Sequence, residues 1–540
     1  MRRIPTLSLL VLALVAPAIG QEALDSALIE RIREEGLKRG QAMATLHQLA
    51  DLAGGRLTAS PGYKLAADWA VQRMTSWGLA KAALEPWDFG HPGWTNQHCA
   101  VHALAPFTAP LHAEVTAWTP STAGVVKGAA ARLDLPEEPL PVELDAAFQA
   151  LEGKLKGKVL LVGPLKSPPV LLTRYSPRLE EAELLKRFDP AAPPAPPRMA
   201  LDRGAPKRTG ALRAKDVDQR IDAFCVAQKA LARVNDAGMR NGLIRAFHNR
   251  SYDPKKAVPT LVLRNEDFGR LWRLMNDGKE AVLELDIRNT LHPASTRGYN
   301  VVAELTGNEH PEEVVLLGAH LDSWHTGTGA TDDGASCAVM MEALRILQAT
   351  GAKPRRTVRM VLFDGEEQGL LGSQAYVKAH FGSDAEPKPE FGKLVAFFNM
   401  DAGAGQLRGL SVFGPPAAAQ VLRELLAPFK DLGAVGASAN RSRLPKPDYA
   451  DITVFSHAGL PAIGLTQDGL EYFEATWHTS VDTIERVPPE DLSRTATILA
   501  SVAYHLANRT QPLPRFGKDD LPPIPPMPAA PMPAPVPSGK

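Results

Sequence analysis

From residue 297 onward, short apolar runs alternate with longer segments whose apolar residues recur at helical spacing. The short runs predict strands, and the longer segments between them predict helices. The expected strands are YNVVAELTG (299–307), EEVVLLGAH (312–320), RTVRMVLFDG (356–365), KLVAFFNMD (393–401) and LPAIGLTQ (460–467). Strands that alternate with helices are typical of an α/β fold with a mostly parallel central sheet flanked by helices.

The chain before these strands has a different pattern. Amphipathic helices are expected at 26–50 and 61–78, where apolar residues recur at helical spacing. Between 119 and 291, short apolar runs are separated by long loops rich in proline and charge. This change of pattern predicts a separate, β-rich domain inserted at 119–291.

The two ends of the chain show patterns that are not those of a folded core. The first residues, MRRIPTLSLLVLALVAPAIG, combine two arginines, a short apolar run and small residues, which is typical of a signal peptide over 1–20. We therefore expect a secreted or periplasmic protein that has no membrane-spanning segment after signal removal. Beyond residue 510 the chain is rich in proline and alanine, so a disordered tail is expected at 511–540.

Composition narrows the classes of function. The 540 residues include 60 Lys and Arg and 60 Asp and Glu, so the formal net charge is zero and no nucleic-acid partner is indicated. The length exceeds that of one compact core, which favours two or more structural units. The three cysteines (99, 225 and 337) cannot all pair within one chain, so the fold does not depend on a disulfide framework.

Residues that can bind a metal follow the carboxyl ends of the predicted strands. Three successive strands are each followed by such residues, and one histidine comes after the last strand. They are His320 and Asp322, then Glu366 and Glu367, then Asp401, and finally His478. Asp332 lies in the glycine- and threonine-rich loop that follows the first of these strands. Because an open parallel sheet binds ligands at the carboxyl ends of its strands, we expect these side chains to lie together.

This set of side chains points to metal ions. Several carboxylates in one partly buried cleft repel each other, and a divalent cation removes that penalty. Histidine and carboxylate without cysteine suit a catalytic zinc site rather than a structural one. Two histidines and more than three acids exceed what one tetrahedral zinc needs, and they suit two ions that share a carboxylate. We therefore expect two Zn²⁺ per chain, although such ligands also accept cobalt or manganese.

Five motifs of this region, taken in order, resemble the zinc exopeptidases of peptidase family M28. They are HLD (320–322), DDGAS (332–336), GEEQGLLGS (365–373), NMD (399–401) and WHTSVDT (477–483). The resemblance covers 292–500 and is greatest to the carboxypeptidase Q branch of the family. It implies one discontinuous peptidase domain, made of 21–118 and 292–510, and a protease-associated-like domain at 119–291.

The resemblance also implies a role for each residue. The metal ligands would be His320 and Asp401 for one zinc, Glu367 and His478 for the other, and Asp332 as a bridge between the two. Asp322 would act beside them by orienting the imidazole of His320. The peptide bond between residues 332 and 333 would be cis, as in related enzymes.

Glu366 is the predicted general base. Neighbouring residues of an extended segment point opposite ways, so Glu366 and Glu367 cannot easily bind the same face of a metal. Glu367 can therefore bind a metal while Glu366 stays free to take a proton from water and pass it to the leaving amine.

The sequence thus predicts an exported di-zinc exopeptidase that acts on short peptides. Aminopeptidase, carboxypeptidase and dipeptidase action stay open, as does the oligomeric state, a homodimer included. One alternative is a transferase similar to glutaminyl cyclases with a single zinc, which would be indicated by one bound zinc and cyclisation of N-terminal glutamine. The other is a non-catalytic, receptor-like binding protein, against which the complete set of ligands argues.

Overall fold

The computed structural model describes residues 22–172, 178–191, 206–444, 446–447 and 449–526. The predicted signal peptide at 1–20 and the last part of the predicted tail, 527–540, lie outside the described residues. Among the helices of the described residues, none is long and apolar enough to span a membrane.

The first of two sheets follows the predicted alternation of strands and helices. Its strands are ordered β1-β10-β12-β11-β13-β16-β14-β15. Their bounds are β1 (Ala80–Asp88), β10 (Arg297–Leu305), β11 (His310–His320), β12 (Arg356–Phe363), β13 (Leu394–Asn399), β14 (Leu407–Phe413), β15 (Gly436–Asn440) and β16 (Ala462–Gln467). The four central strands, β12, β11, β13 and β16, run parallel to one another. β10 pairs antiparallel with β12 and β1, whereas β14 pairs antiparallel with β16 and parallel with β15. The expected α/β fold class is therefore confirmed.

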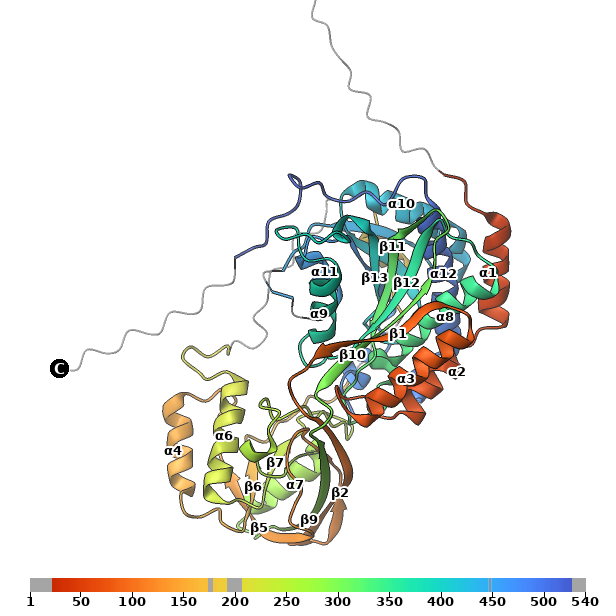
Figure 1. Cartoon of the computed structure of the whole chain (residues 1–540). Helices are drawn as coiled ribbons and strands as arrows, with labels where there is room; N and C mark the ends of the chain where they lie inside the picture. Colours follow the sequence, from red (N-terminus) through yellow and green to blue (C-terminus); the bar gives the residue numbers. More distant parts are fainter. Residues whose placement is uncertain (1–21, 173–177, 192–205, 445, 448, 527–540) are drawn as a thin grey trace, which may run out of the picture.

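Helices cover both faces of this sheet (Figure 1). One face packs against α1 (Ser26–Lys38), α2 (Ala42–His47), α3 (Pro61–Ser76), α8 (Ala335–Ala349), α10 (Pro416–Leu426) and α12 (Pro489–Asn508). The other face packs against α9 (Leu371–His380) and α11 (Ile452–His457). Every residue of α8 from Ala335 to Leu347 is buried, which is the pattern of a helix inside a core. The loop that enters α8 is fixed at its end by this packing.

The second sheet is built from the residues between β1 and β10. Its order is β3-β2-β9-β5-β6-β7-β8-β4. The strands are β2 (Gly93–Ala105), β3 (Ala109–Leu111), β4 (Ala113–Val115), β5 (Val126–Leu133), β6 (Val159–Val162), β7 (Ala232–Asp236), β8 (Thr260–Leu263) and β9 (Val282–His292), and the helices of this stretch are α4 (Pro141–Leu151), α5 (Glu181–Arg187), α6 (Ala214–Gln228) and α7 (Asn265–Asn276). We call the part of the chain from 93 to 292 the inserted unit.

The inserted unit begins earlier than the sequence indicated. The expected boundary was 119, but β2, β3 and β4 all lie before this residue and belong to the second sheet. The alternating pattern at 98–118 identifies strands, but it carries no information about the sheet that they join. β2 pairs with the distant β9, and this pairing places it in the second sheet.

The first part of the expected tail is not free of structure. Leu513 is only 2% exposed. The ring of Phe516 lies 5.3 Å from that of Phe413, centroid to centroid. Arg443 donates from Nη1 to the carbonyl of Pro522 at 3.0 Å. The prediction of a disordered tail is therefore wrong for the residues near 511–522, because a few apolar residues among the prolines reach the core.

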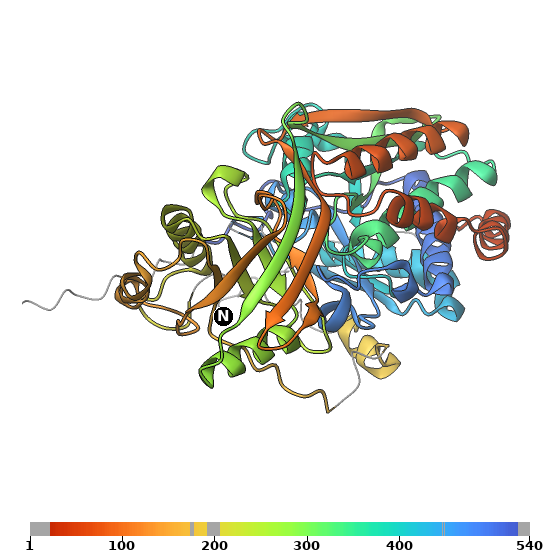
Figure 2. The ribbon, with the colours of Figure 1, turned by 90° about the horizontal axis from the view of Figure 1, so that it is seen from below.

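A two-stranded ribbon joins the two sheets. β1 pairs with β10 in the first sheet, and β2 pairs with β9 in the second. Between these pairs, Gly90 N–H donates to the carbonyl of Thr296 at 3.1 Å and Gly93 N–H donates to that of Ser295 at 2.9 Å. Figure 2 shows β2 and β9 as long neighbouring strands that lead away from the first sheet. The connection is thus hydrogen-bonded along its length.

Candidate metal centre and active site

The strand ends of the first sheet bring the predicted metal ligands together. β11 ends at His320, β12 ends shortly before Glu367, and β13 ends shortly before Asp401. β11 lies between β12 and β13, and all three run parallel, so their carboxyl ends share one edge. Asp332 comes from the turn that leads into α8, and His478 comes from the loop after β16.

These side chains form two groups that share Asp332. The first group is His320, Asp332 and Asp401, and the second is Asp332, Glu367 and His478; within each group the candidate ligand atoms all lie within 4.8 Å of one another. His320 Nε2 lies 3.2 Å from Asp332 Oδ1 and 3.7 Å from Asp401 Oδ1. His478 Nε2 lies 3.2 Å from Asp332 Oδ2 and 2.9 Å from Glu367 Oε2. The two oxygens of Asp332 thus face the two groups.

Buried atoms without hydrogen-bond partners indicate what this centre can hold. Glu367 Oε1 is buried and accepts no hydrogen bond from the described residues. Asp332 Oδ2 is also buried and has only His478 Nε2 beside it, at 3.2 Å. Buried carboxylate oxygens of this kind are costly unless a cation compensates them. Carboxylate oxygens and imidazole nitrogens in groups of three are ligands that zinc accepts. The residues present therefore fit a pair of divalent cations with Asp332 between them.

The electrostatics of the cluster agree with a need for positive charge. Burial raises the pKa of Glu367 to about 7, against the opposing charge of His478. Burial would lower the pKa of His478, but the negative charge of Glu367 and a hydrogen bond to Asp332 raise it to about 10. Without cations the centre therefore retains protons, and bound cations would replace them.

Glu366 lies beside the cluster without belonging to either ligand group. Burial raises its pKa well above the usual range, with the charge of Asp401 adding to the effect and that of His320 opposing it. The residue keeps part of its surface accessible. A carboxylate with a raised pKa and access to water is suited to accepting a proton.

Asp322 is close to the cluster, but it acts differently from the expected role. The atom that accepts from His320 Nδ1 is the backbone carbonyl oxygen of Asp322, at 2.9 Å, whereas its carboxylate lies 3.6 Å from that nitrogen. The carboxylate instead accepts the backbone N–H groups of Glu366 and Glu367, each at 3.2 Å. Asp322 therefore positions the general-base candidate and a metal ligand together. Sequence reasoning could not distinguish the carbonyl from the carboxylate of one residue.

The turn that carries Asp332 is held by a second buried acid. The peptide bond between Asp332 and Asp333 is cis, as the resemblance implied. Asp482 accepts the backbone N–H groups of Thr331 and Asp332 at 2.6 and 3.2 Å. Asp333 accepts the N–H of His320 at 3.2 Å. The turn is thereby tied both to the end of β11 and to the loop that carries His478.

Three residues that support the site were not singled out from the sequence. They are Arg56, Trp324 and Asp482. Arg56 is fully buried and donates to carbonyl oxygens of the loop between β11 and α8. Trp324 donates from Nε1 to Glu367 Oε2 at 2.7 Å. Arg56 lies 265 residues before Leu321, the first residue of this loop, and so leaves no local pattern in the sequence. Trp324, in contrast, follows closely on the HLD motif.

The inserted unit reaches this centre. His325 donates from Nε2 to the carbonyl of Val115 at 2.6 Å, which links the metal-site loop to the inserted unit. The ring of Phe247 lies 5.0 Å from that of Trp324 and 5.5 Å from that of His478, centroid to centroid. Aromatic side chains of the inserted unit therefore pack against a metal-ligand candidate.

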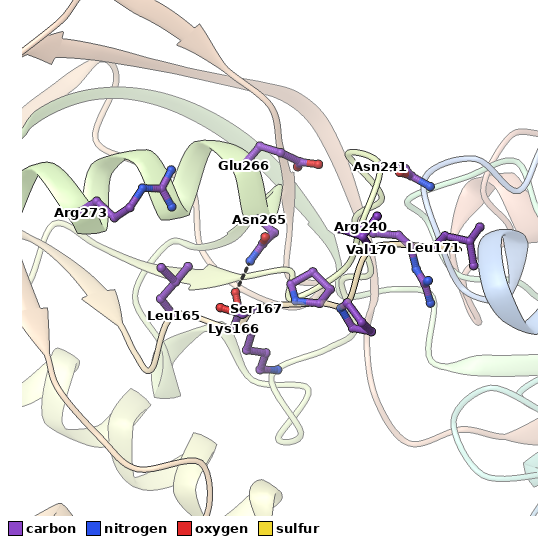
Figure 3. Close-up of a pocket in the computed structure, with 12 residues that line it drawn as sticks. Leu165, Lys166, Ser167, Val170, Leu171, Arg240, Asn241, Asn265, Glu266 and Arg273 are labelled. Atoms are coloured by element: carbon purple, nitrogen blue, oxygen red, sulfur yellow. Dashed lines mark hydrogen bonds between the residues drawn. The ribbon is translucent and has the colours of Figure 1, made fainter. Parts of the chain in front are cut away.

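Two cavities differ in position and character. A cavity of about 580 Å³ lies in the inserted unit and is lined by Lys166, Arg240 and Arg273 among others. Figure 3 shows the hydrogen bond that the side chain of Asn265 donates to the backbone carbonyl of Lys166 in this cavity. A much smaller space, about 10 Å³, adjoins the metal cluster and is lined by Asp332 and Glu367 among others. We place the chemistry at the smaller space, because Glu367, whose buried Oε1 has no hydrogen-bond partner among the described residues, lines it.

Comparison with known proteins gives a family for the region that holds the cluster. Residues 300–503 match the family described as peptidase family M28. Carboxypeptidase Q of Mus musculus is 32% identical over 258 residues, which are 48% of this chain and 52% of that protein. Leupeptin-inactivating enzyme 1 of Streptomyces exfoliatus is 26% identical over 239 residues, 41% of this chain and 51% of that protein. The chain thus spans about half the length of the curated relatives that it matches.

Solved structures extend the similarity to the whole fold. A peptidase M28 precursor from Shewanella amazonensis superposes with a TM-score of 0.63 at 24% identity, covering 93% of this chain and 98% of that one. A zinc aminopeptidase from Bacillus subtilis gives a TM-score of 0.54 at 16% identity, covering 90% of this chain and 98% of that one. These similarities show a common fold.

Proposed function

Residues 300–503 of this chain belong to peptidase family M28, and from that premise we propose that the protein is an exported di-zinc exopeptidase that hydrolyses short peptides near a free terminus. The observation that carries the proposal is the pair of ligand groups that share Asp332, with Glu366 beside them. Export rests on the sequence of residues 1–20 alone.

The proposed ligands divide between two ions. His320 and Asp401 would hold one zinc, Glu367 and His478 would hold the other, and Asp332 would bind both. Zinc at this position supplies polarisation of the scissile carbonyl and a lower pKa for water. The chain itself supplies the arrangement: Asp322 orients the peptide groups of residues 366 and 367, and Asp482 holds the turn of Asp332.

Glu366 moves the proton in the proposed reaction. Its carboxylate would take a proton from the attacking water and return it to the amine of the departing product. Its pKa, which burial raises well above the usual range, favours proton uptake by this carboxylate. The partners of the reaction are short peptides, and the free terminus would be recognised beside the metals.

We further propose that the peptidase domain is discontinuous. Residues 22–88 and 297–510 contribute all strands of the first sheet, and the inserted unit lies between them in the sequence. The two complete ligand groups favour hydrolysis over the single-zinc cyclase, and they likewise argue against a receptor-like protein that has lost its ligands.

The test compares the wild type with Glu366→Gln and, as a matched control, the exposed Glu386→Gln. We expect two zinc ions per chain in all three proteins by elemental analysis. Glu366→Gln should lower kcat on a panel of dipeptides and aminoacyl reporters by about 10²- to 10⁴-fold, the usual contribution of a general base, while Glu386→Gln retains the wild-type rate. Cyclisation of N-terminal glutamine without hydrolysis, or hydrolysis by Glu366→Gln at the wild-type rate, contradicts the proposal.

A further inference from the structure

Trp324 lies between the metal centre and the inserted unit. Its Nε1 donates to Glu367 Oε2 at 2.7 Å. The residue is 5% exposed and packs in the main hydrophobic core of the inserted unit. Among the buried residues of that core that the structure describes, Trp324 is the only one from the chain after residue 292. The loop between β11 and α8 therefore sends one side chain into the inserted unit, and that side chain holds a metal-ligand candidate.

A column of stacked rings supports Trp324 from the inserted unit. We call the four residues of this column, in the order in which they stack, the ring column: His91, Tyr252, His248 and Trp324. Successive ring centroids lie 4.4, 4.9 and 5.6 Å apart, and successive ring planes are inclined by 20°, 17° and 13°. Nearly parallel rings at such separations attract one another beyond the effect of the apolar area that they bury. The ring column therefore restricts the orientation of the Trp324 indole and the direction of its N–H.

The direction of this N–H matters for Glu367. Glu367 Oε2 accepts from Trp324 and lies 2.9 Å from His478 Nε2, whereas Oε1 has no hydrogen-bond partner among the described residues. A carboxylate that is held at one oxygen keeps a defined orientation. Groups that hold a metal ligand in this way commonly determine how tightly the metal binds. The inserted unit thus acts on Glu367 through Trp324.

The two ions of the proposed function differ in their contacts with the inserted unit. We call the ion at His320 and Asp401 the first zinc, and the ion at Glu367 and His478 the second zinc. Phe247 of the inserted unit packs its ring edge against His478, with centroids 5.5 Å apart. Both ligands of the second zinc therefore have aromatic contacts on the side of the inserted unit. Over the part of the chain that the structure describes, no ring of the inserted unit contacts either ligand of the first zinc.

We propose that Trp324 is a positioning residue for the second zinc, and that the ring column lets the inserted unit set the affinity of this ion without changing that of the first. The inference rests on the proposed di-zinc function and specifies how one of its two metal sites is regulated. It also gives the inserted unit a role in the chemistry, although no metal-ligand candidate comes from it.

Two backgrounds separate the ions. Asp401→Asn keeps the second zinc as its tightly bound ion, and Glu367→Ala keeps the first. In each background, Trp324→Phe removes the N–H donor but leaves a ring in the column. Zinc dissociation constants are measured by competition with a chelator of known affinity. Trp324→Phe should raise the dissociation constant by about 10- to 100-fold in the Asp401→Asn background, which is the usual effect of losing a partner of a metal ligand. In the Glu367→Ala background it should leave the constant within about twofold.

Variants of the ring column test the role of the inserted unit itself. His248→Leu removes a ring next to Trp324 and keeps the N–H donor. It should raise the dissociation constant of the second zinc by about 3- to 10-fold, as expected for loss of one ring contact. His248→Phe keeps a flat ring and should restore the original value. Phe148→Leu is the matched control, because it breaks the stacked pair of Phe148 and Phe224 elsewhere in the inserted unit, and it should leave both constants unchanged.

The outcomes separate this inference from the peptidase proposal. Equal weakening by Trp324→Phe in both backgrounds means that the residue supports the fold as a whole, and it overturns the inference. An unchanged second zinc does so as well. The His248 variants carry the same test if Trp324→Phe does not yield folded protein by circular dichroism. Selective weakening of the second zinc in a protein that cleaves no peptide leaves the inference standing and refutes the peptidase function.

Discussion

Replacing Arg56 with methionine tests whether one buried cation holds the loop that carries the metal centre. Arg56 is 0% exposed. Its side chain donates to the carbonyls of Leu321 at 2.5 Å, Leu49 at 3.0 Å, Thr328 at 2.7 Å and Gly329 at 2.8 Å. Three of these four carbonyls belong to the loop between β11 and the turn of Asp332.

The loss of stability expected for Arg56→Met follows from these contacts. Each hydrogen bond from a charged donor contributes about 1.5–3 kcal/mol, and each buried carbonyl that loses its donor costs about 1–3 kcal/mol. Removal of the desolvated charge offsets several kcal/mol of this sum. We expect Arg56→Met to lower the free energy of unfolding by about 3–5 kcal/mol, near the upper limit for single substitutions.

Urea unfolding followed by tryptophan fluorescence measures the change, with zinc content determined on the same samples. Arg56→Lys keeps the charge and fewer donors, so it should fall between Arg56→Met and the wild type. Arg31→Met, at an exposed position of α1, controls for loss of an arginine as such. If Arg56→Met costs less than about 1 kcal/mol and keeps both zinc ions, the carbonyls of the loop do not depend on this side chain.

Three further predictions concern the metals and the response to pH. Asp332→Asn should reduce bound zinc from two ions per chain to fewer than one, whereas Asp401→Asn should leave about one, because Asp332 faces both ligand groups. Elemental analysis measures the zinc content, and equal losses in the two variants would contradict the bridging role of Asp332. Asp322→Asn should lower kcat by about 10- to 100-fold, as is common for groups that orient ligands, and the steady-state rate at saturating peptide measures this. Burial raises the pKa of Glu114 from its ordinary value of 4.5 to about 7, so the folded state favours the neutral carboxyl group. The free energy of unfolding therefore falls as the pH rises from about 4.5 to 7, where the unfolded chain is already ionised. Glu114→Gln should therefore stabilise the protein by about 1–3 kcal/mol at pH 8 and leave it unchanged at pH 4.5, by thermal unfolding at both pH values.

The sequence predicted the strands of the first sheet and the helices that flank it well, because their patterns of apolar residues are long and regular. It also predicted which residues gather at one edge, since parallel strands end on the same side and the five candidate ligands lie at those ends or in the loops that follow them. The structure places the five residues His320, Asp332, Glu367, Asp401 and His478 in two groups that share Asp332, and the candidate ligand atoms of each group lie within 4.8 Å of one another. Their binding of zinc stays a proposal.

What the sequence could not predict depends on contacts between distant segments. The inserted unit begins at β2 because β2 pairs with β9, some 190 residues later. An alternating pattern predicts a strand, but it does not identify the strand with which it pairs. Arg56 and Asp482 look like ordinary polar residues until the loop between β11 and α8 is seen to need their donors and acceptors.

The ribbon that links the two sheets has a mechanical consequence. Because hydrogen bonds continue from the β1–β10 pair through Gly90 and Gly93 into the β2–β9 pair, the inserted unit cannot slide along the peptidase sheet, and it can change its orientation only by bending or twisting this ribbon. Arg178, which belongs to the stretch of chain between the two halves of the first sheet, pairs with Asp468 and Asp491. Because Phe247 of the inserted unit packs against Trp324 and His478, any such bending would also have to shift these ring contacts, so the ribbon and the candidate metal centre are mechanically coupled.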